Sequence, residues 1–116
     1  NVETRFPLIY SEGVLKGRLS RARWVETCCA APARLFDLKT KGQLAPGFDA
    51  DIVIFDPEAR HSYSVNNLHS NTDYSVWEDW KVQGKVDKTF SRGKLIVDGD
   101  AFLGSAEHGQ YLKRTV

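Results

Sequence analysis

The sequence predicts an α+β fold in which helices come first and a small sheet follows. Before Gly42, apolar residues recur at intervals of three and four, which is the spacing of one helix face. After it comes a β-branched apolar run, Ile52–Phe55, which is typical of a strand. Two glycine-containing turns, Pro46-Gly47 and Arg92-Gly93, punctuate this second part.

The composition is that of one small folded domain. The chain has 116 residues, of which 41% are hydrophobic and 27% are charged, so it can bury a core. Its formal net charge is +1, with acidic and basic residues interspersed, which argues against nucleic acid or an anionic membrane as a partner. No apolar run is long enough to cross a bilayer and no signal peptide is evident, so we expect a cytoplasmic protein.

Two helices are expected before Ala31. The first covers residues 3–16, with Pro7 in its first turn, where a missing amide hydrogen is tolerated, and Gly17 ends it. Ser20 caps the second helix. The apolar stripe of this second helix, which we expect to face a core, consists of Trp24, Val25, Cys28 and Cys29.

A third short helix is expected to begin at Ala31-Pro32 and to run towards Leu38. Just before it, the adjacent Cys28 and Cys29 cannot join distant segments, since neighbouring cysteines close only a strained ring. We interpret them as reduced, buried, small apolar residues. A functional vicinal pair is the alternative.

The run Ile52–Phe55 predicts a short strand that is buried on both faces and closed by Pro57. A turn at residues 57–59 then leads into a second, half-exposed strand at residues 60–65, where polar and apolar residues alternate. Residues 66–80 lose this periodicity and predict an ordered loop. The side chains expected to pack inward from the loop are Leu68, Tyr74, Trp77 and Trp80.

The rest of the sheet is expected as short strands and turns. Gly84 interrupts strand residues and suggests a bulge. Arg92-Gly93 has the chemistry of a hairpin turn. The tail, residues 104–116, is expected to be extended. The strands are residues 81–83, 85–91 and 94–98, and the next turn is residues 98–100.

Histidines and aspartates are the first candidates for chemistry. His61, His69 and His108 have no cysteine or paired carboxylate at a metal-ligand interval, so we interpret them as surface or hydrogen-bonding residues. Asp49 and Asp51 are two positions apart at the head of a strand, so their side chains are expected to point to opposite faces and not to hold one ion together. Asp49 would instead accept hydrogen bonds from turn amides, and Asp51 would mark the exposed end of the strand.

Ser11 and Glu12 lie near the end of the first helix and could face a cleft, but spacing identifies no partner base or nucleophile for them. Trp24, Trp77 and Trp80 have no basic stripe beside them, which favours a core role over stacking on nucleic-acid bases. The residues alone therefore predict no catalytic, substrate-binding or metal-binding position in this chain.

Several ordered segments resemble the D-hydantoinase and dihydropyrimidinase family. Val2–Val14 resembles the segment that follows the last metal ligand of these enzymes. Gly42–Asp56 resembles the glycine, Asp-Ala-Asp and apolar-strand signature of the wider amidohydrolase superfamily. The sequence departs from the usual pattern at residues 77–80 and 105–107. Three further landmarks are Leu68–Tyr74, Ser91–Lys94 and Gly109–Arg114.

This resemblance implies the C-terminal portion of a cyclic amidohydrolase that has a TIM (β/α)8 barrel and a small β-sandwich. Residues 1–41 would be the terminal helices of the barrel, residues 42–103 the C-terminal part of the sandwich, and residues 104–116 an extended tail. A start at Asn1 in a chain without methionine agrees with a fragment. The parent enzyme would hydrolyse the ring amide of hydantoins or dihydropyrimidines.

The resemblance also implies two divalent metals, usually zinc, and a carbamylated lysine in the parent enzyme. Their ligands would lie upstream of Asn1, so this chain is expected to hold no cofactor and not to be catalytic alone. Its partners would be the remainder of the parent polypeptide, a small-molecule substrate and further subunits of a dimer or tetramer. The alternatives are a non-catalytic dihydropyrimidinase-like scaffold and an allantoinase-type relative.

Overall fold

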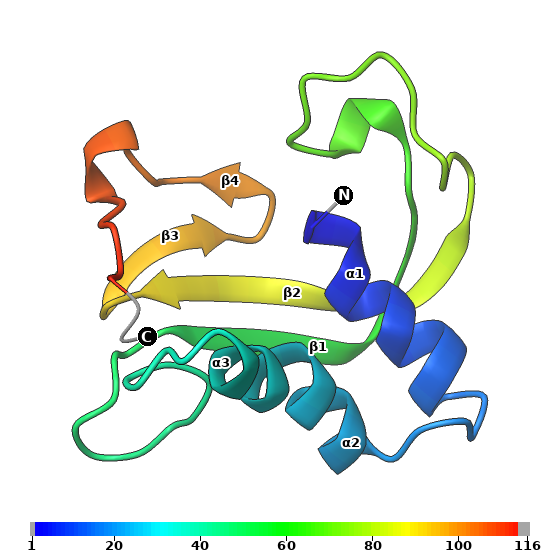
Figure 1. Ribbon diagram of the computed structural model, residues 1–116. Helices are drawn as coiled ribbons and strands as arrows, with labels where there is room; N and C mark the ends of the chain where they lie inside the picture. Colours follow the sequence, from blue (N-terminus) through cyan, green and yellow to red (C-terminus); the bar gives the residue numbers. More distant parts are fainter. Residues whose placement is uncertain (1, 114–116) are drawn as a thin grey trace. The chain divides into compact units, whose positions relative to one another are not determined.

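A computed structural model of the protein describes residues 2–113, in which helical segments precede a four-stranded sheet (Figure 1). The chain forms two compact units. Unit 1 contains the residues up to Trp24 together with Asp56–Lys85, and unit 2 contains Val25–Phe55 together with the residues from Val86 onward. The α+β order predicted from the sequence is confirmed. The barrel and sandwich boundaries at residues 41 and 103 stay predictions.

The first helical segment begins at Val2, earlier than its sequence suggests. Helix α1, Val2–Ile9, continues directly as a π-helix, Tyr10–Val14. Pro7 therefore lies inside the helix, and the prediction that it occupies the first turn is wrong. Proline has no amide hydrogen to donate to a helix hydrogen bond. A few residues later the backbone hydrogen bonds take the wider spacing of a π-helix, in which the amide of Leu15 bonds the carbonyl of Tyr10.

Gly17 ends this segment as predicted. Its φ is +69°, its amide bonds the carbonyl of Val14, and the amide of Arg18 bonds the carbonyl of Gly13. This pair of bonds is the Schellman pattern, in which a residue with positive φ follows the last helical residue and satisfies carbonyls that the helix leaves unpaired.

The second helical segment is continuous, whereas two separate helices were predicted. Helix α2, Arg21–Val25, passes through a π-helix, Glu26–Ala30, into helix α3, Ala31–Leu35. Helix α3 begins at Ala31 with Pro32 in its first turn, as predicted, but it continues directly from the π-helix, since Ala30 already has helical angles. The cap at Ser20 is confirmed, because its Oγ accepts a hydrogen bond from the amide of Arg23 at 3.1 Å.

Helix α3 ends at Leu35 and does not reach Leu38. Asp37 takes a φ of +55°, its amide bonds the carbonyl of Arg34, and the amide of Leu38 bonds the carbonyl of Ala33. Aspartate here performs the role that glycine performs at residue 17, because its short polar side chain tolerates the left-handed region.

The predicted apolar stripe of the second helix is only partly buried. Trp24 is 6% exposed, whereas Val25 is 46% exposed. Cys28 and Cys29 are reduced and half-buried, which corrects the prediction that they are buried.

Strand β1, Ile52–Ser62, is longer and more exposed than predicted. It runs through Pro57, so the predicted turn at residues 57–59 is wrong, and the two predicted strands are one. The side chain of Asp56 accepts hydrogen bonds from the amides of Glu58 and Ala59, which supports the backbone just after the proline. Val53 and Ile54 are 47% and 46% exposed, so this part of the strand is not buried on both faces.

Strands β2, Lys81–Ser91, and β3, Lys94–Asp98, form the predicted hairpin (Figure 1). Arg92 and Gly93 have φ of +47° and +78°, the pattern that a tight hairpin turn requires at both central residues. β3 pairs antiparallel with β4, Ala101–Phe102, after the turn that contains Gly99. The strands follow the order β1-β2-β3-β4.

Gly84 has a φ of +100° within β2, and the bulge suggested at this position stays a prediction. A register shift between β2 and β3 lies further on, at Thr89 and Phe90. The tail contains a short 3-10 helix, Ala106–His108, that was not predicted. The prediction of an extended tail at residues 114–116 lies outside the described residues.

The loop between β1 and β2 starts with a 3-10 helix, Val65–Asn67, which is held by a capping box. The side chain of Asn67 accepts a hydrogen bond from the backbone amide of Ser64, and the side chain of Ser64 accepts one from the backbone amide of Asn66. Its aromatic side chains do not all pack inward as predicted. Tyr74 is 68% exposed and Trp80 is 44% exposed, while Trp77 is half-buried.

The core of unit 1 forms around Trp24. The indole ring centroid lies 4.1 Å from that of Phe6 and 5.0 Å from that of Tyr10, and its Nε1 donates to the carbonyl of Phe6 at 3.1 Å. Tyr63, 3% exposed, donates its hydroxyl hydrogen to the carbonyl of the buried Thr4 at 3.1 Å. Burial raises the pKa of Tyr63 to about 12.

Candidate functional site

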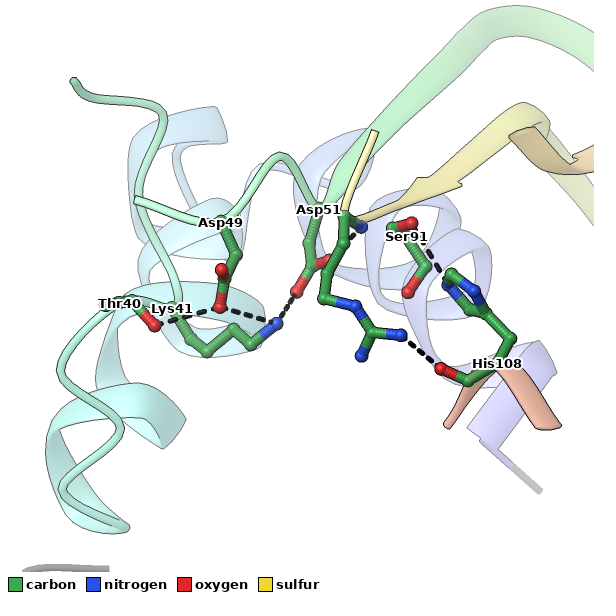
Figure 2. Close-up of polar contacts among 7 residues, drawn as sticks. Thr40, Lys41, Asp49, Asp51, Ser91 and His108 are labelled. Carbon is green, nitrogen blue, oxygen red and sulfur yellow. Dashed lines mark hydrogen bonds and ion pairs between the residues drawn. The ribbon is translucent and has the colours of Figure 1, made fainter. Parts of the chain in front are cut away.

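Charged side chains of unit 2 gather around one ammonium group. The Nζ of Lys41 lies 3.0 Å from the Oδ2 of Asp49 and 2.5 Å from the Oδ2 of Asp51 (Figure 2). Thr40 donates its hydroxyl hydrogen to Asp49 at 2.8 Å, and the amide of Arg92 donates to the Oδ1 of Asp51 at 2.8 Å. These five residues are called the Lys41 cluster below.

A turn brings the two sides of the cluster together. The amide of Phe48 bonds the carbonyl of Ala45, and Gly47 between them has a φ of +86°, so the predicted turn at Pro46-Gly47 is confirmed. The amide of Asp49 then bonds the carbonyl of Thr40 at 2.9 Å. The chain thus returns past its own preceding segment, which places the aspartates beside Lys41.

The prediction that Asp49 and Asp51 point to opposite faces is wrong. It assumed strand geometry, but β1 begins only at Ile52, so strand alternation does not apply to either aspartate. Both carboxylates instead hold one cation, the ammonium of Lys41. The sequence signal that identifies this pairing is a lysine before a Pro-Gly turn and an Asp-Ala-Asp segment after it.

The charges of the cluster shift one another's protonation. Hydrogen bonds from Lys41 and Thr40 lower the pKa of Asp49. Partial burial opposes ionisation of Asp51, but the bonds from Lys41 and from the Arg92 amide outweigh it and lower the pKa of Asp51. Burial likewise acts against the charged form of Lys41, yet the bonds to Asp51 and Asp49 raise its pKa. All three groups are therefore charged at neutral pH.

The cluster continues into the hairpin turn and the tail. The amide of Gly93 bonds the carbonyl of Ala50 at 2.9 Å, next to the bond between Arg92 and Asp51. The guanidinium of Arg92 donates to the carbonyl of His108, whose Nε2 lies 3.1 Å from the carbonyl oxygen of Ser91 (Figure 2). The polar groups of this arrangement hold the main chain of three segments in place. These segments are the stretch before β1, the turn between β2 and β3, and the tail.

Replacing Lys41 with methionine is expected to lower the free energy of unfolding by about 1 kcal/mol at neutral pH, because two carboxylates lose the cation between them. Lys39→Met is the matched control. The ammonium of Lys39 pairs with Asp37, but its side chain is 72% exposed, so a smaller loss is expected. Urea-induced unfolding of both variants measures the difference.

The same experiment has a defined pH dependence. The folded-state pKa values of Asp49 and Asp51 lie below their ordinary value of 3.8, so their stabilisation is present above 3.8 and is lost as the pH falls through the folded-state values. The folded-state pKa of Lys41 lies above 10.5, so its contribution is lost as the pH rises through that value. If the loss of unfolding free energy caused by Lys41→Met stayed constant from neutral pH down to about pH 2, this account would be contradicted.

Of the two remaining histidines, His69 takes the predicted hydrogen-bonding role and His61 packs on an aromatic ring. The Glu3 carboxylate accepts from the backbone amide of His69 at 2.9 Å, and its other oxygen lies 2.9 Å from the His69 Nδ1. His61 packs edge-to-face on Tyr63, with ring centroids 5.2 Å apart. Among residues 2–113, no group of three or more His, Cys, Asp or Glu side chains is arranged to hold a metal ion.

Ser11 and Glu12 separate in the structure. Ser11 is buried, and its Oγ accepts a hydrogen bond from the backbone amide of Gln83 at 3.2 Å. Glu12 lines an open cleft of about 480 Å³ within unit 1, so the expectation that it faces a cleft is confirmed for this residue. A hydrogen bond from Lys16 lowers the pKa of Glu12. The other lining residues are Leu8, Ile9, Gly13, Arg18, Leu19, Trp77 and Trp80.

Comparison with known proteins assigns the family. The sequence pattern of the amidohydrolase family matches residues 1–96, which is most of the chain. The chain therefore belongs to the amidohydrolase family.

None of the helices described between Val2 and Lys113 has the length and apolar character that a membrane span requires.

The similar proteins within this family are hydantoinases and a dihydropyrimidinase. The chain is 46% identical over 114 residues to D-phenylhydantoinase from Escherichia coli O127:H6, covering 97% of this chain and 25% of that protein. The structure of D-hydantoinase from Bacillus sp. AR9 matches 96% of the chain with 44% identity and a TM-score of 0.92. Dihydropyrimidinase from Brevibacillus agri matches 96% of it with 39% identity and the same score. The chain spans about a quarter of the length of these relatives.

Proposed function

We propose that this chain is the C-terminal part of a metal-dependent cyclic amidohydrolase that hydrolyses the ring amide of hydantoins or dihydropyrimidines. The observation that carries the proposal is the 46% identity to D-phenylhydantoinase along 97% of the chain. The longer polypeptide to which the segment would belong is called the parent protein below. We also propose a parent that acts in the cytoplasm as a dimer or tetramer.

Within the parent protein, the role of this segment is structural. Residues 1–41 would supply the closing helices of a TIM barrel, residues 42–103 the returning strands of a β-sandwich, and residues 104–116 a tail. The Lys41 cluster supports this role, because its polar atoms connect the segment before β1 to the turn between β2 and β3. Because the side chains of this cluster pair with one another and with backbone groups, we assign them to maintaining the fold.

The family resemblance implies two divalent metals, zinc in the usual case, with a carbamylated lysine. The residues that the structure describes in this segment, 2–113, do not fit that centre. The two carboxylates that converge, those of Asp49 and Asp51, already share the ammonium of Lys41, and Asp51 accepts a further bond from the amide of Arg92. The metal ligands and the residues that contact the substrate would therefore lie in the rest of the parent protein.

An activity comparison tests the proposal. With Zn²⁺ supplied, the parent protein is expected to open hydantoin or dihydrouracil, while the 116-residue chain alone is expected to remain at the rate of the buffer. Turnover by the 116-residue chain would contradict its structural role. A parent protein that opens neither ring when Zn²⁺ is supplied would contradict the enzymatic function, and the absence of the metal-binding histidines and lysine from its sequence would favour the scaffold alternative.

A further inference from the structure

We propose that the cleft between the end of the first helical segment and the Trp77–Trp80 turn is the docking site for an apolar segment of the parent polypeptide that lies outside these 116 residues. This inference rests on the proposed function in one respect, since it requires the parent protein to be longer than the chain. The occupant is a stretch of main chain that presents a large aliphatic or aromatic side chain.

The walls of the cleft are mainly apolar. Leu8, Ile9 and Leu19 line one part, and the two tryptophans line another. Trp80 is 44% exposed, although an indole ring is among the largest apolar surfaces that a side chain can bury. A hollow with such walls gains free energy when apolar atoms replace the water in it.

Local contacts hold the cleft in shape. The rings of Trp77 and Trp80 meet edge to face, with centroids 5.7 Å apart and planes at 80°. The amide of Trp80 bonds the carbonyl of Trp77, and the carbonyl of Trp80 accepts from the amide of the buried Tyr63. At the other wall, a Cβ on Gly13 would lie 3.1 Å from the Cδ1 of Leu19, so these residues already pack tightly. A preformed surface binds without first paying to order its own side chains.

The charged residues of the cleft do not favour an ionic ligand. The carboxylate of Glu12 is already engaged by the ammonium of Lys16, one helical turn away. A cationic ligand would have to displace Lys16. The other charged residue of the lining, Arg18, has the opposite sign to Glu12, so the two together give the lining no net charge that would select an anion. The cleft therefore favours apolar surface over an ionic ligand.

The length of the relatives argues for a segment of the same polypeptide. Structures that match this chain at a TM-score of 0.92 are about four times as long, so the same fold occurs there together with three times as much additional chain. A segment of one polypeptide is present at a high effective concentration, which favours it over a second copy of the chain or a free small molecule.

Photocrosslinking in the parent protein tests the proposal. The photoreactive amino acid p-benzoylphenylalanine replaces Trp80 in one variant and Tyr74 in the control variant. Tyr74 is an aromatic residue of the same loop, is 68% exposed and does not line the cleft. After irradiation of dilute protein, mass spectrometry identifies the crosslinked peptides. The expected result is an intramolecular crosslink from position 80 to residues outside the 116-residue segment, at several times the yield seen from position 74.

Two results would overturn the proposal. Crosslinks from position 80 that join two copies of the protein would assign the cleft to self-association. A yield no higher than that from position 74, with Trp80→Phe leaving the melting temperature unchanged, would show that no segment covers it. Ring-opening activity is measured on the same samples, so loss of activity with the crosslink retained contradicts only the proposed function, and activity without the crosslink contradicts only this inference.

Discussion

Replacing Gly42 with alanine is expected to lower the free energy of unfolding by about 3 kcal/mol. A Cβ at this position would lie 2.7 Å from the Cβ of Ala33 and 2.8 Å from the carbonyl oxygen of Cys29. Neither neighbour is the end of a flexible side chain, so the helical segment or the loop must move. The φ of +81° adds backbone strain of about 1–2 kcal/mol for a residue with a Cβ, and overpacking adds a similar amount.

Gly47 provides the matched control for this prediction. Its φ of +86° is almost the same, but a Cβ there would meet no atom within 4 Å. Gly47→Ala should therefore carry the backbone strain alone, about 1–2 kcal/mol. Urea-induced unfolding of the two variants separates the terms. If both substitutions reduced stability equally, close packing of the loop against the helix at Gly42 would be wrong.

Replacing Trp24 with alanine is expected to be the most destabilising change in unit 1, with a loss of about 3–5 kcal/mol. The indole is 6% exposed and lies against the rings of Phe6 and Tyr10, so its removal leaves a cavity between segments that it joins. The hydrogen bond from its Nε1 to the carbonyl of Phe6 is lost as well.

Trp24→Phe separates packing from hydrogen bonding. Phenylalanine retains a ring between Phe6 and Tyr10 but has no donor for the carbonyl of Phe6, so a loss of about 1–2 kcal/mol is expected. Thermal or urea unfolding of both variants measures the two losses. A phenylalanine variant as unstable as the alanine variant would show that the hydrogen bond, and not ring packing, dominates at this position.

Local features of the fold were predictable from the sequence because they depend on one residue and its neighbours. Gly17 ends a helix with a positive φ, Ser20 caps the next, and Gly47 and Gly93 take the positive φ of their turns. Each of these residues has an intrinsic backbone preference or a short side chain suited to its position. Such signals do not require knowledge of distant segments.

The errors arose where distant residues decide the outcome. Pro57 was expected to end a strand, but its carbonyl accepts a hydrogen bond from the side chain of Gln83, and Asp56 supports the amides that follow. Asp49 and Asp51 were assigned to opposite faces because the sequence does not show where strand geometry begins. Both carboxylates pair with Lys41, which the Pro46-Gly47 turn brings beside them.

The cleft that Glu12 and Trp80 line was less predictable than the fold. The sequence identified Glu12 as a residue that could face a cleft, but it did not identify Trp80 as part of the same cleft. The two residues are far apart along the chain, and hydrophobicity alone indicated that Trp80 would be buried. A 44% exposed indole is therefore information that only the structure supplies.

The position of Asp51 has a consequence for the kinetics of folding. Its carboxylate bonds the amide of Arg92, 41 positions along the chain, so this bond cannot form until the intervening segment has closed into a loop. Contacts of such high sequence separation usually form after the local turns that bring them together. Weakening this bond should therefore accelerate unfolding more than it slows folding, so that Asp51 would lengthen the lifetime of the folded state.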